Sequence, residues 1–387
     1  MRQIKGVHTI KGSSIELKAS ILVEGVSADD DSLAELGRKY KEQNHGLFGW
    51  DFEDHVDKLL PDDFCLPDGT VVQFRMNSRS PYRVRKQGSD MLLSCNGEDI
   101  CTVNWIERPG FYSQKASSGR DMVKIGQIGG EDCLFFCYQN YCAHFANNKE
   151  CYFCNLVSTS KTYNSVLKKK DIDDIGEVAK AAWSEGKVNH LLLTGGCFNN
   201  QKEVELVSKV IASIKRHTGF ERVPGTILPS PAKGDHLKMY YETGIQAIGF
   251  SMEIWDEKLY SAICPGKSEQ TSHRQFLQSI EVAVKLFGAG NVYGVFVMGL
   301  EPRETFLQGV EVLSGIGANV VPFVWSPNPG SKLEGHRAPS AAWYLDTTLE
   351  AADIVLKNGV PPGTENHCFR CDGNSLLHDA LRLKGIE

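Results

Sequence analysis

The chain has 387 residues, of which 41% are hydrophobic, and a formal net charge of −6. This length suits one large domain or two modest ones with a substantial core. The negative net charge and the lack of a long basic run argue against a nucleic-acid partner. No apolar run approaches the length of a membrane span and the N-terminus does not resemble a signal peptide, so we expect no membrane contact.

The sequence contains twelve cysteines, a high number for a chain of this length. Without a secretion signal, such cysteines indicate reduced thiols and metal chemistry rather than a disulfide framework. We therefore expect a cytoplasmic protein that binds a metal.

Residues 1–128 are predicted to form an accessory region that is mostly β-structure. An alternating pattern predicts a strand over 15–23, and residues 30–43 are expected to form a helix. The other predicted strands are 70–74, 82–85, 91–94 and 100–106, with Asn96-Gly97 as a hairpin turn. A basic group (Arg75, Arg79, Arg83, Arg85 and Lys86) can hold an anionic substrate, but the solvated face of a small sheet explains it better.

From residue 133 onward, strand-like and helix-like segments alternate regularly. The predicted strands are 133–141, 188–196, 223–229, 246–254, 291–299 and 319–325. The predicted helices are 171–187, 202–218, 237–244, 272–288, 302–317 and 341–358. This alternation is typical of a parallel sheet, which either closes toward a barrel or forms a doubly wound layer. In both arrangements the functional site lies at the carboxyl ends of the strands.

Three cysteines lie on the loop that follows the strand at 133–141. Cys142, Cys151 and Cys154 have the spacing C-x8-C-x2-C. A C-x2-C pair brings two thiolates to one metal centre, and the third can fold back from the loop. Zinc would require a fourth ligand, which His144 can supply. Three cysteines without an obligatory fourth suit an iron–sulfur cluster that keeps one iron open.

The ending Cys151-Tyr152-Phe153-Cys154 resembles the cluster loop of the radical S-adenosylmethionine (SAM) superfamily. The usual spacing in that family is C-x3-C-x2-C, and longer first gaps occur in some of its branches. The segment Thr194-Gly195-Gly196 resembles the family's glycine motif, which holds the methionine end of SAM. The family often has Glu after these glycines, where this chain has Cys197.

Two later strand ends extend the resemblance. Ser251 and Glu253 end the strand at 246–254, before Cys264-Pro265-Gly266-Lys267. A carboxylate there is costly to bury without a partner, so Glu253 either binds SAM or pairs with a neighbouring cation. Gly299, at the end of the next predicted strand, looks like the family residue that leaves room for the adenine ring.

The resemblance implies a partial (β/α)6 barrel over residues 129–345. It implies that Cys142, Cys151 and Cys154 hold a [4Fe–4S] cluster, and that SAM is bound by Thr194, Gly195, Gly196, Ser251, Glu253 and Gly299. Reductive SAM cleavage would then start hydrogen abstraction on a small biosynthetic metabolite or peptide, with an electron donor such as flavodoxin or ferredoxin. The alternative is a zinc-binding protein or zinc hydrolase using Cys142, His144, Cys151 and Cys154.

Residues 346–387 are predicted to form a C-terminal helix and a cysteine-containing tail. Cys368 and Cys371 form a second C-x2-C pair. This pair can join Cys264 or another cysteine in a second iron–sulfur cluster or a zinc site, or act as free thiols. The remaining cysteines, Cys65, Cys95, Cys101, Cys133, Cys137 and Cys197, are predicted to be small buried hydrophobic residues.

Overall fold

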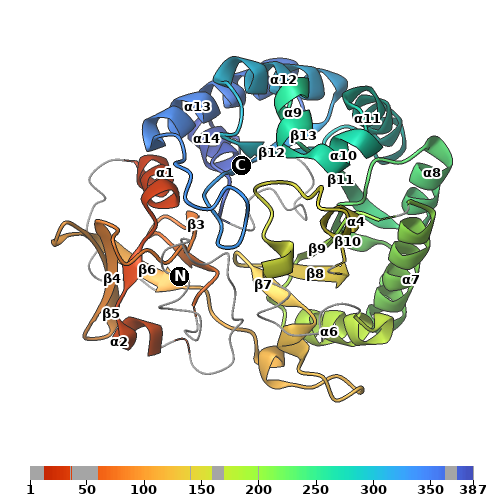
Figure 1. Ribbon diagram of the computed structural model, residues 1–387. Coiled ribbons are helices and arrows are strands. Elements are labelled where there is room, and N and C mark those ends of the chain that lie inside the picture. Colours follow the sequence, from red (N-terminus) through yellow and green to blue (C-terminus); the bar gives the residue numbers. More distant parts are fainter. Residues whose placement is uncertain are drawn as a thin grey trace.

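The computed structural model describes residues 13–34, 36, 60–139, 141–158, 170–198, 200–361 and 373–386. It contains a six-stranded sheet, in the order β1-β4-β5-β6-β2-β3, and a seven-stranded sheet, in the order β13-β12-β11-β10-β9-β8-β7 (Figure 1).

The N-terminal sheet confirms the four strands predicted between residues 70 and 106. Asn96 and Gly97, with φ of 51° and 87°, form the predicted turn between β5 and β6. Helix α2, Asp30–Ala34, starts the predicted helix at 30–43, most of which lies outside the described residues. The strands are β1 (Ser27–Ala28), β2 (Asp63–Cys65), β3 (Val71–Gln73), β4 (Tyr82–Gln87), β5 (Asp90–Cys95) and β6 (Glu98–Trp105).

The predicted strand at 15–23 is wrong, because this segment is helix α1, Ser14–Glu24. The helix starts with a capping box between Ser13 and Glu16, and ends at Gly25, whose φ is 70°. Its two sides pack into different cores: Ile15, Ala19 and Leu22 face the barrel, and Leu17 and Ile21 face the N-terminal sheet. A helix buried on both sides has no single apolar stripe, so its sequence does not show the period of an amphipathic helix.

The seven-stranded sheet is the predicted partial (β/α)6 barrel. Strands β8 to β13 are parallel to one another, and β7 (Gln127–Gly129) pairs antiparallel with β8 at one edge. The parallel strands are β8 (Cys133–Gln139), β9 (His190–Gly195), β10 (Val223–Ile227), β11 (Ile245–Glu253), β12 (Val292–Met298) and β13 (Asn319–Val324).

Helices form an arc around the outside of these strands (Figure 1). They are α6 (Ile172–Ser184), α7 (Asn200–Thr218), α8 (Gly234–Glu242), α11 (His273–Phe287), α12 (Arg303–Ile316) and α13 (Ala341–Asn358). Shorter helices are α4 (Ala143–Ala146), α9 (Glu257–Ile263), α10 (Pro265–Gln270) and α14 (Leu377–Leu383), with 3-10 turns at Gly110–Ser113 and Met122–Lys124. None of the described helices combines the length and apolar character needed to cross a membrane.

The C-terminal segment returns to the open edge of the barrel at β13. Phe323 forms an antiparallel bridge with Ser375, and the backbone N–H of Val324 donates to the carbonyl of Asn374 over 2.9 Å. The buried Arg75 of the N-terminal sheet donates to the Val324 carbonyl and to Asn374 Oδ1. Phe323 and Val324 are the last two residues of β13. Residues 374–375 therefore lie at the end of the barrel where the parallel strands have their carboxyl ends.

Candidate functional site

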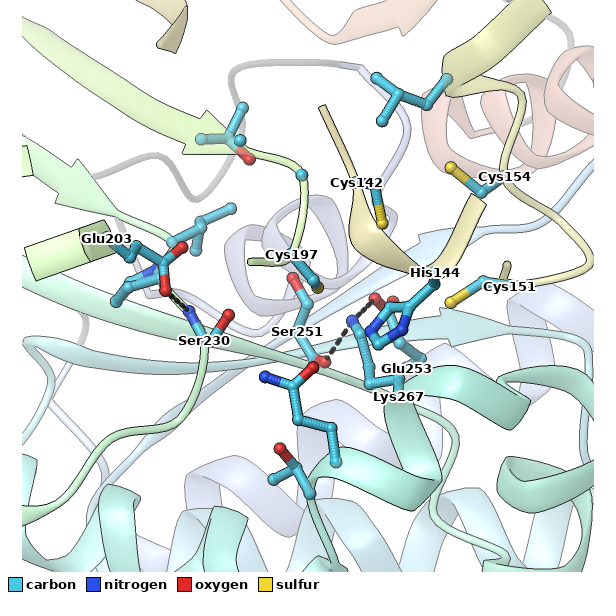
Figure 2. A pocket seen from close by; sticks show the side chains of 18 of the residues that line it. Cys142, His144, Cys151, Cys154, Cys197, Glu203, Ser230, Ser251, Glu253 and Lys267 are labelled. Carbon is cyan, nitrogen blue, oxygen red and sulfur yellow. Dashed lines mark hydrogen bonds and ion pairs between the residues drawn. The ribbon is translucent and has the colours of Figure 1, made fainter. Parts of the chain in front are cut away.

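A cavity of about 280 Å³ opens at the carboxyl ends of β8, β9, β10 and β11. Figure 2 shows that its labelled side chains come from the cysteine loop and the loops after β9 and β10, from the end of β11, and from helices α7 and α10. Nine of the residues predicted from sequence line it: Cys142, His144, Cys151, Cys154, Thr194, Gly195, Gly196, Ser251 and Glu253. Cys368 and Cys371 lie outside the described residues.

Gly299, by contrast, does not line this cavity in the described part of the chain. Its φ is 105°, and a Cβ there would collide with the hydroxyl of Tyr344. That hydroxyl donates to the carbonyl of Trp325 over 3.0 Å. In this structure the glycine therefore allows a close approach of α13 to the end of β12.

The cysteine loop folds back so that its two ends meet at the cavity. Cys142 precedes α4 as its N-cap residue, and the Lys149 N–H returns to the His144 carbonyl over 2.8 Å. The Tyr152 N–H donates to the carbonyl of Ile263 over 2.9 Å, which holds the loop against the end of α9. The wide first gap in the cysteine spacing is therefore taken up by one short helix and a turn.

The environment of each thiol differs. A hydrogen bond from the Cys197 side chain lowers the pKa of Cys142 to about 7 against the effect of burial, aided by backbone N–H groups of His144, Cys197 and Phe145. Burial raises the pKa of Cys154 to about 12, and the charge of Cys151 acts in the same direction. A metal that binds Cys154 must displace this proton, because the thiolate is the ligand form.

The donor set fits a multi-iron cluster better than a single zinc ion. Within the described ranges, no three His, Cys, Asp or Glu side chains gather closely enough to hold one metal ion. Cysteines around a cubane cluster bind three different irons, so they need wider spacing than the ligands of one ion. His144 is 7% exposed, and its buried Nε2 has no hydrogen-bond partner among the described residues.

The Gly195-Gly196 turn packs directly on the cysteine loop. The Ala143 N–H donates to the Cys197 carbonyl over 2.9 Å, which joins the two loops. A Cβ at Gly196 would collide with the carbonyl of Tyr141 and lie 2.9 Å from the Cβ of Cys142. The glycine is therefore required for the position of Cys142, as well as for any ligand that approaches the backbone.

We expect Gly196→Ala to lower both iron content and SAM affinity, the latter by about tenfold, because overpacking costs ~1–3 kcal/mol. The measurements are iron per chain after anaerobic reconstitution and a SAM binding titration. Gly315→Ala is the matched control, since a Cβ at Gly315 meets nothing within 4 Å. Unchanged iron and SAM affinity in Gly196→Ala would show that the loops tolerate the methyl group.

Glu253 is paired with Lys267 inside the cavity (Figure 2). Lys267 Nζ lies 2.5 Å from Glu253 Oε1 and donates to the carbonyl of Ser251 over 3.1 Å. Burial disfavours the charged amine, but Glu253 and the nearby thiols outweigh it and raise the pKa of Lys267 well above its ordinary value. Glu253 has a φ of 69°, at an irregularity in the pairing of β11 with β12. Strained backbone of this kind is found preferentially at functional sites.

Sequence reasoning assigned no role to Lys267 or Glu203, which also line the cavity. Glu203 accepts hydrogen bonds from the Tyr138 hydroxyl over 3.0 Å and from the Ser230 N–H over 3.1 Å. Burial raises the pKa of this carboxyl. Glu203 thus ties α7 to β8 and to the loop after β10. The sequence feature that points to Lys267 is Glu253, because a buried carboxylate needs a cation nearby.

Comparisons with known proteins match this part of the chain. The family model of the radical SAM superfamily covers residues 138–312. Bacteriochlorophyllide c C-7(1)-hydroxylase of Chlorobaculum limnaeum is 26% identical over 301 residues, 72% of this chain and 74% of that protein. Biotin synthase of Campylobacter lari is 24% identical over 189 residues, 48% of this chain and 64% of that protein.

Among solved structures, HydG, a maturase of the [FeFe]-hydrogenase, is similar with a TM-score of 0.46 and 15% identity. The match covers 62% of this chain and 53% of HydG, so the chain spans about half the length of that structure. The family match at 138–312 includes all nine predicted residues that line the cavity. Residues 138–312 are therefore identified as a radical SAM domain, and the chain as an enzyme whose cofactors are a [4Fe–4S] cluster and SAM.

Proposed function

We propose that Cys142, Cys151 and Cys154 hold the [4Fe–4S] cluster, and that the enzyme abstracts a hydrogen atom from a small biosynthetic metabolite or peptide. The observation that carries this proposal is that the three thiols share one cavity with the Gly-Gly turn and the end of β11. The bound cofactors supply the one-electron cleavage of SAM that starts the reaction. The chain contributes binding, orientation and the exclusion of water.

The polar groups of the cavity suit the amino-acid part of SAM. Lys267 has three N–H donors, of which one meets Glu253 and one meets the Ser251 carbonyl, leaving one for an anion such as the SAM carboxylate. Glu253 is the partner expected for the SAM ammonium or the ribose hydroxyls. The backbone of Thr194, Gly195 and Gly196 faces the same space. A contact between Gly299 and the adenine ring stays a prediction.

The substrate is proposed to be a biosynthetic small molecule. The cavity wall includes four apolar side chains, Phe145, Phe153, Leu156 and Leu228, which help to exclude water. One relative is a hydroxylase that acts on a bacteriochlorophyllide and the other is a synthase of biotin, both biosynthetic enzymes by name. These likenesses support modification of a carbon centre, with flavodoxin or ferredoxin as the proposed electron donor.

The test is anaerobic reconstitution followed by metal analysis and a SAM cleavage assay. We expect iron and sulfide in the ratio of a [4Fe–4S] cluster, and release of methionine and 5′-deoxyadenosine when a reductant and SAM are added. Stoichiometric zinc, with neither iron uptake nor SAM cleavage, would instead support the zinc site of Cys142, His144, Cys151 and Cys154.

The second metal site is tested by the variant Cys368→Ala/Cys371→Ala. We expect lower total metal than in wild type and slower substrate turnover, whereas SAM cleavage without substrate continues because the first cluster is untouched. The flanking residue 373 is fixed against the N-terminal sheet through the Gln73 N–H, which donates to the Gly373 carbonyl over 3.1 Å. Unchanged iron and zinc in the double variant would eliminate this site.

A further inference from the structure

A second cavity, of about 590 Å³, lies between the N-terminal region and the loop that follows β13. Its lining comes from the end of α1, from the turn between β3 and β4, and from the loop that leads into α13. Helix α1 lies beside α13 in Figure 1, so these segments meet although they are far apart in the sequence. The cavity shares no lining residue with the cavity of the cysteines, and the proposed reaction does not use it.

The charged groups of this second cavity are mostly cationic. Arg79, His336 and Arg337 line it, and Glu24 is the one carboxylate among its described lining residues. The guanidinium of Arg337 has no hydrogen-bond or ion-pair partner within the described part of the chain. A local excess of positive charge in a chain of net charge −6 suits an anionic ligand.

The basic group noted in the sequence analysis has several different roles in the structure. Arg75 is buried and donates to the backbone at the end of β13. Arg85 is paired with Asp99 over 2.8 Å. Arg83 is exposed on β4, whereas Arg79 lines the second cavity. The structure therefore distinguishes Arg79 from the solvated face of the sheet.

The backbone on both sides of the cavity is fixed. The Arg79 N–H donates to Asn77 Oδ1 over 2.9 Å, and Asn77 Nδ2 donates to the Glu24 carbonyl over 2.6 Å, which ties this turn to the end of α1. Ser340 caps α13 by accepting the Trp343 N–H over 3.2 Å, and the first turn of this 18-residue helix has no acidic residue. The positive end of the helix dipole adds to the charge of the arginines.

We propose that the second cavity binds a phosphate or carboxylate group of a small molecule, held by Arg79 and Arg337. The planar guanidinium group donates paired N–H groups to both kinds of anion. The loop that carries Arg337 also contacts the cysteine loop, because the Leu333 N–H donates to the Tyr152 carbonyl over 3.0 Å. One loop thus joins this cavity to the proposed active site. We therefore assign the anionic group to the substrate, and this assignment rests on the proposed function.

The experiment is a calorimetric titration of the reconstituted holoenzyme with inorganic phosphate, at saturating SAM and constant ionic strength. We expect one saturable site in wild type, and binding weaker by at least about tenfold in Arg79→Gln/Arg337→Gln, because two charged donors are lost. Glu24→Gln removes the carboxylate and should bind phosphate more tightly. Arg83→Gln is the matched control, since it removes an exposed arginine of the same region that does not line the cavity.

The absence of saturable phosphate binding in wild type would overturn the proposal, as would wild-type affinity in the double arginine variant or in Glu24→Gln. All these variants should keep the iron content and SAM cleavage of wild type, because the changed side chains lie outside the cavity of the cysteines. We expect phosphate to leave the rate of SAM cleavage without substrate unchanged, and a changed rate would assign the site to a regulatory anion instead. Failure of the proposed function is distinguishable, because wild type would then assemble no cluster, whereas phosphate binding requires none.

Discussion

Replacing Cys142, Cys151 or Cys154 by alanine is expected to remove the [4Fe–4S] cluster and to lower SAM cleavage by at least about 100-fold. Each thiol would bind a different iron, so the loss of one leaves an iron without its anchor. All three side chains line one cavity, and the cysteine loop is tied to the loops after β9 and β11. The measurements are iron and sulfide per chain after reconstitution, and the rate of 5′-deoxyadenosine release.

Cys137→Ala is the control, since Cys137 lines the same cavity but its Sγ donates to the Gln139 carbonyl over 3.2 Å. We expect this variant to keep its iron and its SAM cleavage. Full cleavage in Cys142→Ala together with loss of iron in Cys137→Ala would move the third ligand from Cys142 to Cys137. The wide first gap in the cysteine spacing would then be misassigned.

The barrel could be predicted from the sequence because each of its elements has a strong local signal. Strands β8 to β13 are short apolar runs, and the helices between them have one apolar face and clear ends. Helix α11 is an example: Ser272 and Gln275 form its capping box and Gly288 ends it. Since a parallel sheet places its functional residues at the carboxyl ends of strands, these elements predicted where the site lies, and the resemblance to the radical SAM superfamily supplied the roles of its residues.

The remaining features depend on contacts between segments far apart in the chain. Helix α1 packs into two cores, so its apolar residues do not follow one helical period. Its Lys18 forms a buried ion pair with Asp379 of α14 over 2.7 Å. The contact between the Ala143 N–H and the Cys197 carbonyl, which joins the cysteine loop to the loop after β9, is likewise set by how separate segments meet. The boundary of the N-terminal region at residue 128 stays a prediction. Helix α1 belongs to that region in sequence but contacts α13 of the barrel.

Replacing Lys267 by methionine is expected to weaken SAM binding by about 10- to 150-fold, because a hydrogen bond to a charged group contributes ~1.5–3 kcal/mol. The variant should also lose about 3–5 kcal/mol of unfolding free energy, because Glu253 is left buried without its cation. Both side chains of this pair are little exposed, at 12% and 11%. The measurements are a SAM titration of the reconstituted enzyme and equilibrium unfolding in urea.

The double variant Lys267→Met/Glu253→Gln separates these two effects. Removing both charges should restore most of the stability, since no unpaired charge remains buried, while SAM affinity stays low because the cation is still missing. Lys149→Met is the matched control: its ion pair with Glu269 of α10, at 2.6 Å, is exposed, and such pairs contribute only ~0–1 kcal/mol. If Lys267→Met loses stability but binds SAM as tightly as wild type, the ion pair holds the loop after β11 in place and the SAM carboxylate binds elsewhere.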